Sequence, residues 1–209
     1  AGGGGSTAES AGPRMAGMAR RARPERLGAL VALDRSPALV AVDRVLARRL
    51  GVDGGGLWKA EDPGLEVDPL TAPTEVHLAV TERCPAGCKG CYADARPQGH
   101  HPSTEELTAR LRELGRQGVF SVAFGGGEAM IRDDLPALAR AARDAGLRPT
   151  MTTSGLGLTP ARARELRDFD QVNVSYDGRG ATYEAVRGYD GAARAERAMA
   201  ALRAAGVPF

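Results

Sequence analysis

The C-terminal two thirds of this 209-residue sequence alternates strand-like and helix-like segments, and no other feature constrains the fold as strongly. Each strand-like run precedes a polar or glycine-containing turn and then a helix-like stretch. Such a repeat forms a parallel sheet with right-handed crossovers, so the sequence predicts an α/β fold. The predicted strands are 75–80 (EVHLAV), 119–124 (VFSVAF), 148–153 (RPTMTT) and 171–176 (QVNVSY).

The predicted helices have recognisable start and end signals. Ser103 and Glu106 have the spacing of a capping box, and the leucines that follow recur on one helical face. Glycine is a common residue just after a helix. The remaining predicted signals are an Asp133 cap with Pro136 in the first turn, a Thr159 cap followed by Pro160, and a helix from about Gly191 to Ala205 that ends at Gly206.

Four strand–helix units are too few for a closed barrel, which needs about eight strands. The final residues, GVPF (206–209), read as the opening of a fifth strand. We therefore predict a partial (β/α) barrel over residues 71–209, with parallel strands and incomplete at its C-terminal side.

The N-terminal third has a different pattern. Residues 1–24 are rich in Gly, Ala and Arg without an apolar period, so we expect a disordered lead-in. Residues 25–70 are predicted to form an accessory segment and linker, with a hairpin from the runs ALVALD and ALVAVD and a short helix with Val45, Leu46 and Leu50 at helical spacing. Trp58 is expected to pack as an anchor.

Composition and charge exclude several classes of protein. Charged residues make up 26%, the formal net charge is +2, and no apolar run is long enough to span a bilayer. The arginines are spread along the chain without a basic stripe, so neither a nucleic acid nor a membrane is expected as a partner. The three cysteines fall within eight residues, which favours a metal centre in a reducing compartment and a cytoplasmic location.

Polar or glycine-rich segments follow all four predicted strands. In parallel α/β folds the carboxyl ends of the strands share one edge, where ligands bind. The four segments are therefore expected to form a single site. They are TERCPAGCKGC (81–91), GGGE (125–128), TTSG (152–155) and SYDG (175–178).

Cys84, Cys88 and Cys91 are the candidate metal ligands. Thiolates at this spacing in one loop can surround a soft metal centre, and the glycines between them ease the bending of the backbone. One alternative is a zinc site in which His100 or His101 is the fourth ligand. Both histidines follow Cys91 by nine residues or more, beyond the usual short ligand spacings.

The segment CPAGCKGC resembles the CxxxCxxC signature of radical S-adenosylmethionine (SAM) enzymes, and the likeness continues through GGGE, TTSG and VSYDG over about residues 74–209. Within that family it is most similar to the branch with auxiliary iron–sulfur clusters in a C-terminal SPASM or twitch domain, many of whose members modify peptides. The resemblance implies that the three cysteines bind a [4Fe–4S] cluster whose fourth iron is left for SAM.

The same resemblance implies a SAM-binding set. Gly126, Gly127 and Glu128 would hold the methionine amino group, and Thr153 and Ser154 would line the cofactor, although the family usually has Asn at position 154. The segment TYEAVRG (182–188) resembles a family HDxxRG stretch, but Tyr183 and Glu184 stand where the family usually has His and Asp. The remaining implied SAM contacts are Ser175, Asp177 and Arg187.

The resemblance also implies reductive cleavage of SAM, which starts radical chemistry on a peptide or small-molecule substrate, with an electron donor such as a flavodoxin or ferredoxin. A cofactor-biosynthesis enzyme of the molybdopterin type is the alternative within the family. A zinc-stabilised, non-catalytic binding module is the alternative outside it. For residues 27–58, packing against the barrel is favoured over docking of a substrate or leader peptide.

Overall fold

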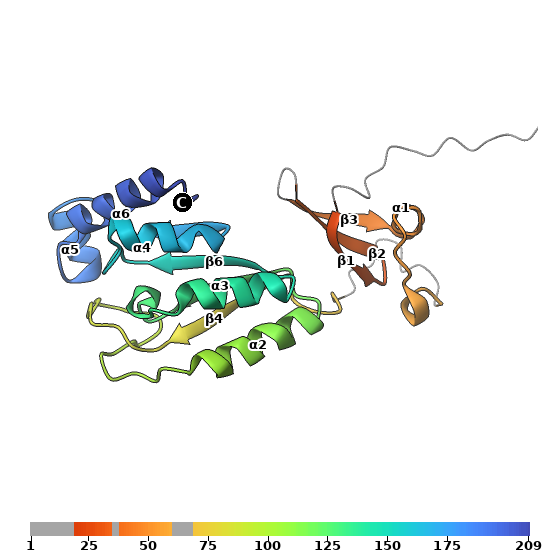
Figure 1. Ribbon diagram of the computed structural model, residues 1–209, viewed down its shortest axis with the longest axis horizontal. Helices are drawn as coiled ribbons and strands as arrows, with labels where there is room; N and C mark the ends of the chain where they lie inside the picture. The colour runs from red at the N-terminus through yellow and green to blue at the C-terminus, as the bar shows by residue number, and fades with distance from the viewer. Residues whose placement is uncertain (1–18, 35–37, 60–68) are drawn as a thin grey trace, which may run out of the picture. The chain divides into compact units, whose positions relative to one another are not determined.

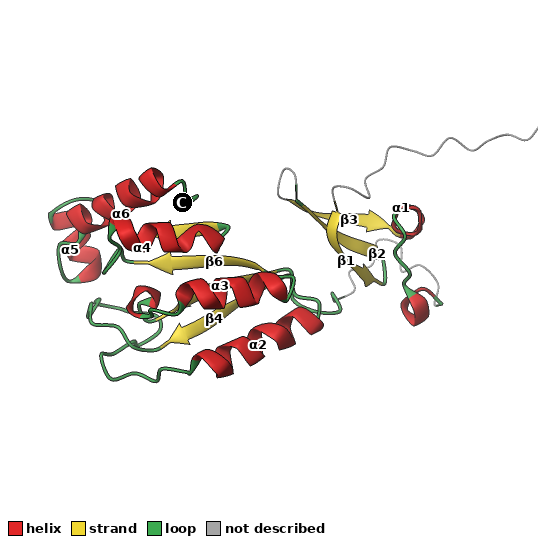
Figure 2. Ribbon diagram, in the orientation of Figure 1, coloured by secondary structure: helices red, strands yellow, loops and turns green. Residues whose placement is uncertain are grey.

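A computed structural model of the chain describes residues 19–34, 38–59 and 69–209. The chain divides into two compact units, Ala1–Thr71 and Ala72–Phe209, and each is described by itself. Figure 1 shows the elements of both units, and Figure 2 distinguishes helices, strands and loops. No helix in the described part of the chain is both long and apolar enough to cross a membrane.

The second unit is built on a four-stranded parallel sheet in the order β4-β5-β6-β7, which confirms the predicted α/β fold with parallel strands. Beyond α6, the Pro208 carbonyl oxygen accepts a hydrogen bond of 2.9 Å from the Val172 N–H of β7. The curvature of a partial barrel stays a prediction. The elements are β4 (Glu75–Thr81), α2 (Thr104–Arg116), β5 (Ser121–Gly126), α3 (Leu135–Asp144), β6 (Arg148–Thr153), α4 (Pro160–Glu165), β7 (Gln171–Val174), α5 (Ala181–Arg187) and α6 (Ala192–Ala205).

The two faces of this sheet differ in burial. On one face, side chains such as Phe124, Met151 and Val172 are fully buried against the helices, with α2 beside α3 and α4 beside α6 (Figure 1). Neighbouring positions in the strands point the other way, and there Ala79 and Thr152 are exposed. Because successive side chains in a strand alternate between faces, the sheet presents one apolar face to the helices and leaves residues of the other accessible.

The predicted helix signals are largely confirmed. Ser103 and Glu106 form the capping box, and the Thr159 hydroxyl caps α4. The Asp133 cap is wrong, because α3 begins after Asp134, and Asp133 is an exposed residue that pairs with Arg162. The Asp134 carboxylate does not cap the helix either, because it binds Arg132 and Thr104.

The first unit contains an antiparallel sheet in the order β1-β2-β3, formed by β1 (Ala19–Glu25), β2 (Gly28–Leu33) and β3 (Ala38–Asp43), followed by α1 (Arg44–Arg49). The predicted hairpin and helix are present. The predicted disordered lead-in is wrong for residues 19–24, which pair with β2, and residues 1–18 lie outside the described residues. Strand β1 was missed because its sequence, ARRARPE, has too few apolar residues to show a strand pattern.

Buried polar contacts hold β1 in place. Arg23 and Glu25 form an ion pair of 2.6 Å with side chains that are 7% and 2% exposed, and Thr71 donates two hydrogen bonds to the same carboxylate. The Trp58 indole N–H donates to the Glu25 carbonyl, so Trp58 packs as the anchor that the sequence predicts.

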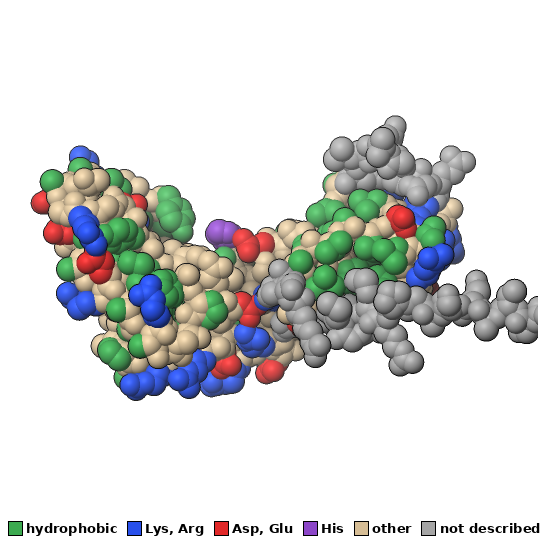
Figure 3. All heavy atoms as spheres, turned by 90° about the horizontal axis from the view of Figure 1, so that it is seen from above, with side chains coloured by type: hydrophobic (Ala, Val, Ile, Leu, Met, Phe, Trp, Pro, Cys, Tyr) green, Lys and Arg blue, Asp and Glu red, His purple; other side chains and the backbone are tan. Residues whose placement is uncertain are grey.

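Apolar side chains remain exposed on this unit. Of the three apolar positions predicted for the helix, Leu50 packs against the small core beside the buried Ala47. Leu46 and Val45 are 39% and 59% exposed, so the prediction is wrong for these two. Leu39 and Val40 of β3 are also exposed. Hydrophobic side chains are visible on the surface of this unit in Figure 3.

Candidate functional site

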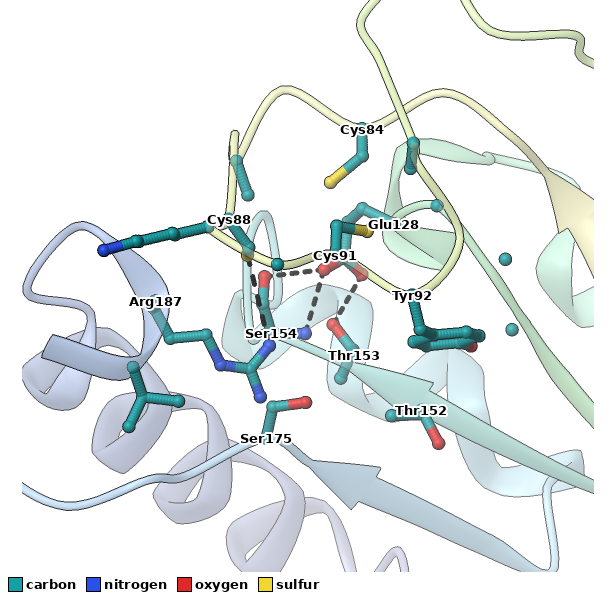
Figure 4. Close-up of a pocket in the computed structure, with 18 residues that line it drawn as sticks. Cys84, Cys88, Cys91, Tyr92, Glu128, Thr152, Thr153, Ser154, Ser175 and Arg187 are labelled. Carbon is teal, nitrogen blue, oxygen red and sulfur yellow. Dashed lines mark hydrogen bonds between the residues drawn. The ribbon is translucent and has the colours of Figure 1, made fainter. Parts of the chain in front are cut away.

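The polar segments that follow the strands of the second unit meet around a cavity of about 300 Å³ (Figure 4). The cavity lies at the carboxyl ends of the parallel strands, as expected for this class of fold. Its volume is at the lower end of the range for small-molecule sites. Of the residues that the family resemblance implies as cluster or SAM contacts, all except Asp177 line it: Cys84, Cys88, Cys91, Gly126, Gly127, Glu128, Thr153, Ser154, Ser175 and Arg187.

The cysteine loop follows β4 and is fixed at two points by backbone hydrogen bonds. Near its start, the Cys84 N–H donates to the Arg96 carbonyl at 3.0 Å, and farther along, the Lys89 N–H donates to the Arg187 carbonyl at 3.0 Å. Gly87 and Gly90 have φ angles of +65° and +68°, which other residues rarely adopt. The loop therefore carries its three thiols, all free and partly buried, around one side of the cavity (Figure 4).

The glycines of the GGGE segment lie against the backbone that enters the cysteine loop. A Cβ at Gly126 would be 2.3 Å from the Thr81 carbonyl oxygen, and one at Gly127 would be 2.1 Å from that of Arg83. The Gly127 N–H donates to the Thr81 carbonyl oxygen at 2.6 Å, and the Glu128 N–H donates to the Arg83 carbonyl oxygen at 3.0 Å. Glycine is thus required here for close packing of two protein segments, a reason that the sequence alone does not reveal.

Glu128 is the centre of the hydrogen-bond network in the cavity wall. Its side chain is buried, and one carboxylate oxygen accepts the Thr153 hydroxyl at 2.6 Å and the Met130 N–H at 3.1 Å. The other accepts both the N–H and the hydroxyl of Ser154, at 2.9 and 2.6 Å (Figure 4). Four donors satisfy the buried carboxylate, which joins the end of β5 to the end of β6.

The predicted residues after β7 separate into two groups. Ser175 and Arg187 line the cavity, whereas Asp177 does not. The Asp177 carboxylate instead accepts a hydrogen bond of 2.5 Å from Arg187 Nε, and the two side chains are 31% and 25% exposed. Asp177 is therefore placed to orient Arg187.

The surroundings of the Cys84 thiol disfavour its ionisation. Burial raises the pKa of Cys84, and the charges of Glu128, Cys88 and Cys91 raise it further, while a backbone hydrogen bond from Ala86 opposes them. Like charges disfavour further ionisation, and a bound cation would reverse that effect. The donor set accordingly fits a positively charged, sulfur-binding group.

The two histidines of the zinc alternative have other partners. The His101 ring nitrogens lie 3.0 Å from the Thr81 hydroxyl and 3.3 Å from Arg132 Nη1, and His100 makes backbone hydrogen bonds with Glu82. Neither histidine lines the cavity. Within the residues that the structure describes, no group of three or more His, Cys, Asp or Glu side chains is placed to hold a single metal ion. The geometry does not support a Cys₃His zinc site.

Some residues at the site were not predicted. Thr152 lines the cavity and belongs to the quoted TTSG segment, so its position after a strand was an available signal. Lys89, Tyr92 and Val186 also line it. The Tyr189 hydroxyl lies 3.6 Å from the Cys88 sulfur, although Tyr189 does not line the cavity. No spacing or composition in the sequence marks Tyr189. Burial raises the pKa of its hydroxyl, and the contact with Cys88 adds to that effect.

A comparison with protein families assigns residues 78–209 to the radical SAM superfamily. The chain belongs to this superfamily. The match begins within β4 and extends through α6, the region that builds the cavity. The family predicted from the cysteine spacing and the three other segments is thus confirmed.

Named radical SAM relatives are longer than this chain. A PqqA peptide cyclase from Ruegeria pomeroyi is 34% identical over 157 residues, which are 70% of this chain and 41% of the relative. A pre-heme d1 synthase from Dinoroseobacter shibae is 36% identical over 152 residues, 66% of this chain and 37% of the relative. The chain therefore spans less than half the length of these curated relatives.

Solved structures show the same fold. Streptococcus suis SuiB superimposes with a TM-score of 0.66 at 16% sequence identity, over 89% of this chain and 52% of SuiB. The structure titled native anSMEcpe with bound AdoMet and Cp18Cys peptide has a TM-score of 0.56 at 20% identity, over 66% of this chain and 42% of that chain. At these identities the likeness concerns the fold alone.

Proposed function

We propose that this chain forms the SAM-cleaving part of a radical SAM enzyme that modifies a peptide. The observation that carries the proposal is the convergence of three cysteine thiols with the GGGE, TTSG and Ser175 segments on one cavity. Membership of the superfamily supports the same chemistry. When bound, a reduced [4Fe–4S] cluster supplies the electron that cleaves SAM into methionine and a 5′-deoxyadenosyl radical.

Cys84, Cys88 and Cys91 would hold the cluster. The fit is supported by three free thiols on one loop, all of which line the cavity. Iron–sulfur clusters are commonly held by four thiolates, but these are the only cysteines in the sequence. Three ligands leave one coordination position for a second group, as catalytic metal sites do.

The residues across the cavity would bind and orient SAM. Ser175 and the Arg187 guanidinium present polar groups to the cavity, and Arg187 can pair with a carboxylate. The Glu128 carboxylate accepts four hydrogen bonds from within the protein. Its main role in this proposal is therefore to fix the cavity wall that contains Thr153 and Ser154. Gly126 and Gly127 bring that wall close to the cysteine loop.

A peptide substrate is supported by the relatives and neighbours. The Ruegeria protein is named a PqqA peptide cyclase, and solved neighbours include SuiB bound to its precursor peptide SuiA. The pre-heme d1 synthase supports a second candidate, in which a radical SAM enzyme makes a cofactor, although of a different kind from molybdopterin. An electron donor such as a flavodoxin or ferredoxin is part of the proposal, because cleavage consumes an electron.

Anaerobic reconstitution tests the function. The chain should bind about four iron and four sulfide ions and should form 5′-deoxyadenosine from SAM when dithionite is added. Separate Cys84→Ala, Cys88→Ala and Cys91→Ala variants should lose this product. One bound zinc per chain with no SAM cleavage would contradict the proposal. Incubation with candidate precursor peptides, read by mass spectrometry, tests the substrate separately.

A further inference from the structure

The end of α5 and the residues just after it, Arg187 to Tyr189, pack against the cysteine loop at Cys88. The Lys89 N–H donates to the Arg187 carbonyl at 3.0 Å, which joins the two segments through their backbones. The Tyr189 hydroxyl lies 3.6 Å from Cys88 Sγ, and Arg187 Nη1 lies 4.0 Å from the same sulfur. Two side chains from one short segment therefore place a hydroxyl and a guanidinium beside one sulfur.

This arrangement is asymmetric among the cysteines. In the described part of the chain, no side-chain hydrogen bond to the sulfur of Cys84 or Cys91 is found, whereas Cys88 contacts both a hydroxyl and a guanidinium. Tyr189 is not among the residues that line the cavity. Its hydroxyl can act on the sulfur without occupying space in the cavity.

The surrounding residues hold Tyr189 in this position. Its ring lies 6.0 Å from that of the fully buried Tyr183, and the Arg194 guanidinium lies 5.1 Å from its centroid. Gly188 ends α5 in a left-handed turn with φ of +81°. Gly191 leaves space for both rings, since a Cβ there would be 2.8 Å from Tyr189 Cε2 and 2.9 Å from Tyr183 Cε1.

The donor direction follows from the chemistry of the sulfur. A cysteine that binds iron is a thiolate without a proton, so the Tyr189 hydroxyl must donate and Cys88 must accept. Reduction adds one negative charge to an iron–sulfur cluster. Hydrogen bonds to its sulfurs and nearby positive charges stabilise the more negative state and raise the reduction potential.

We infer that Tyr189 is a positioning residue for the cluster, whose hydrogen bond to Cys88, together with the Arg187 charge, makes the cluster easier to reduce. This inference rests on the proposed function. It assigns a role in electron entry to a residue outside every motif that identified the family. SAM binding is not expected to need the Tyr189 hydroxyl.

The test compares midpoint potentials of the reconstituted 209-residue chain by EPR-monitored redox titration. Tyr189→Phe removes only the hydroxyl and should shift the potential to more negative values. Tyr176→Phe is the matched control: its hydroxyl contacts Glu196 and Arg179 instead of a thiol, and its potential should equal that of the wild type. Equal potentials for the wild type and Tyr189→Phe would overturn the inference while leaving the proposed function intact.

A second variant covers the case in which Tyr189→Phe assembles no cluster. Gly191→Ala keeps the hydroxyl but displaces both tyrosine rings, and it should shift the potential in the same negative direction. An unchanged potential in this variant would count against the inference. If the wild-type chain itself forms no [4Fe–4S] cluster, the proposed function fails, and the inference fails with it.

Discussion

Glu128 and Ser154 are joined twice, because one carboxylate oxygen of Glu128 accepts both the N–H and the hydroxyl of Ser154, at 2.9 and 2.6 Å. The serine stands where the family resemblance predicts asparagine. Its side chain is thus committed to the buried carboxylate that connects two strand ends. These hydrogen bonds should therefore stabilise the fold, in addition to shaping the wall of the predicted binding site.

Ser154→Ala should destabilise the chain by about 1–3 kcal/mol, because a hydrogen bond to a charged, buried group is lost while the N–H bond remains. The free energy of unfolding in urea measures the change. Ser175→Ala is the matched control, since Ser175 also lines the cavity but its hydroxyl has no hydrogen bond in the described part of the chain. A loss of equal size in both variants would contradict the role given to Ser154.

Gly127→Ala should disrupt the site without changing any functional group. The added methyl would lie 2.1 Å from the Arg83 carbonyl oxygen, so the entry to the cysteine loop must move. We expect a lower melting temperature and less iron bound after reconstitution. Gly87→Ala is the control, because its Cβ meets nothing within 4 Å and only the positive φ is strained, at roughly 1–2 kcal/mol. Full iron loading in Gly127→Ala would refute this account.

Asp177 can have one of two roles: it contacts the cofactor directly, or it orients Arg187. Under the second reading, Asp177→Asn should weaken SAM binding in the wild-type background but have little further effect in an Arg187→Ala background. A double-mutant cycle, with SAM affinity measured by calorimetry on the reconstituted chain, gives the coupling, expected at about 0.5–3 kcal/mol. Additive effects of the two substitutions would favour independent contacts.

The sequence predicts the alternation of strands and helices, the position of the site segments at the carboxyl ends of the strands, and the family, because hydrophobic period, cysteine spacing and glycine position are local properties. It does not predict which partner a polar side chain selects. Asp133 and Asp134 are adjacent and chemically alike, but Asp134 is partly buried against Arg132, whereas Asp133 is exposed and pairs with Arg162. Tyr189 is likewise visible only in three dimensions, since 101 residues separate it from Cys88.

Asp134 should make part of the stability dependent on pH. Burial opposes its ionisation, but hydrogen bonds from Arg132 and Thr104 outweigh burial and lower the pKa of Asp134. A carboxylate whose pKa is lower in the folded state stabilises the fold above its unfolded pKa, about 3.9, and that contribution is lost as the pH falls through the folded value. Stability should therefore decrease on acidification below about pH 4.

Asp134→Asn should remove this part of the acid dependence. At neutral pH it should also cost about 1–3 kcal/mol, because Arg132 loses a charged partner but keeps its bonds to the Val80 and Pro102 carbonyls. Urea unfolding between pH 3 and pH 7 measures both effects. Asp133→Asn is the control, since Asp133 is almost fully exposed and its ion pair with Arg162 should contribute little. Parallel pH profiles for the wild type and Asp134→Asn would show that the pair of Asp134 with Arg132 does not govern acid stability.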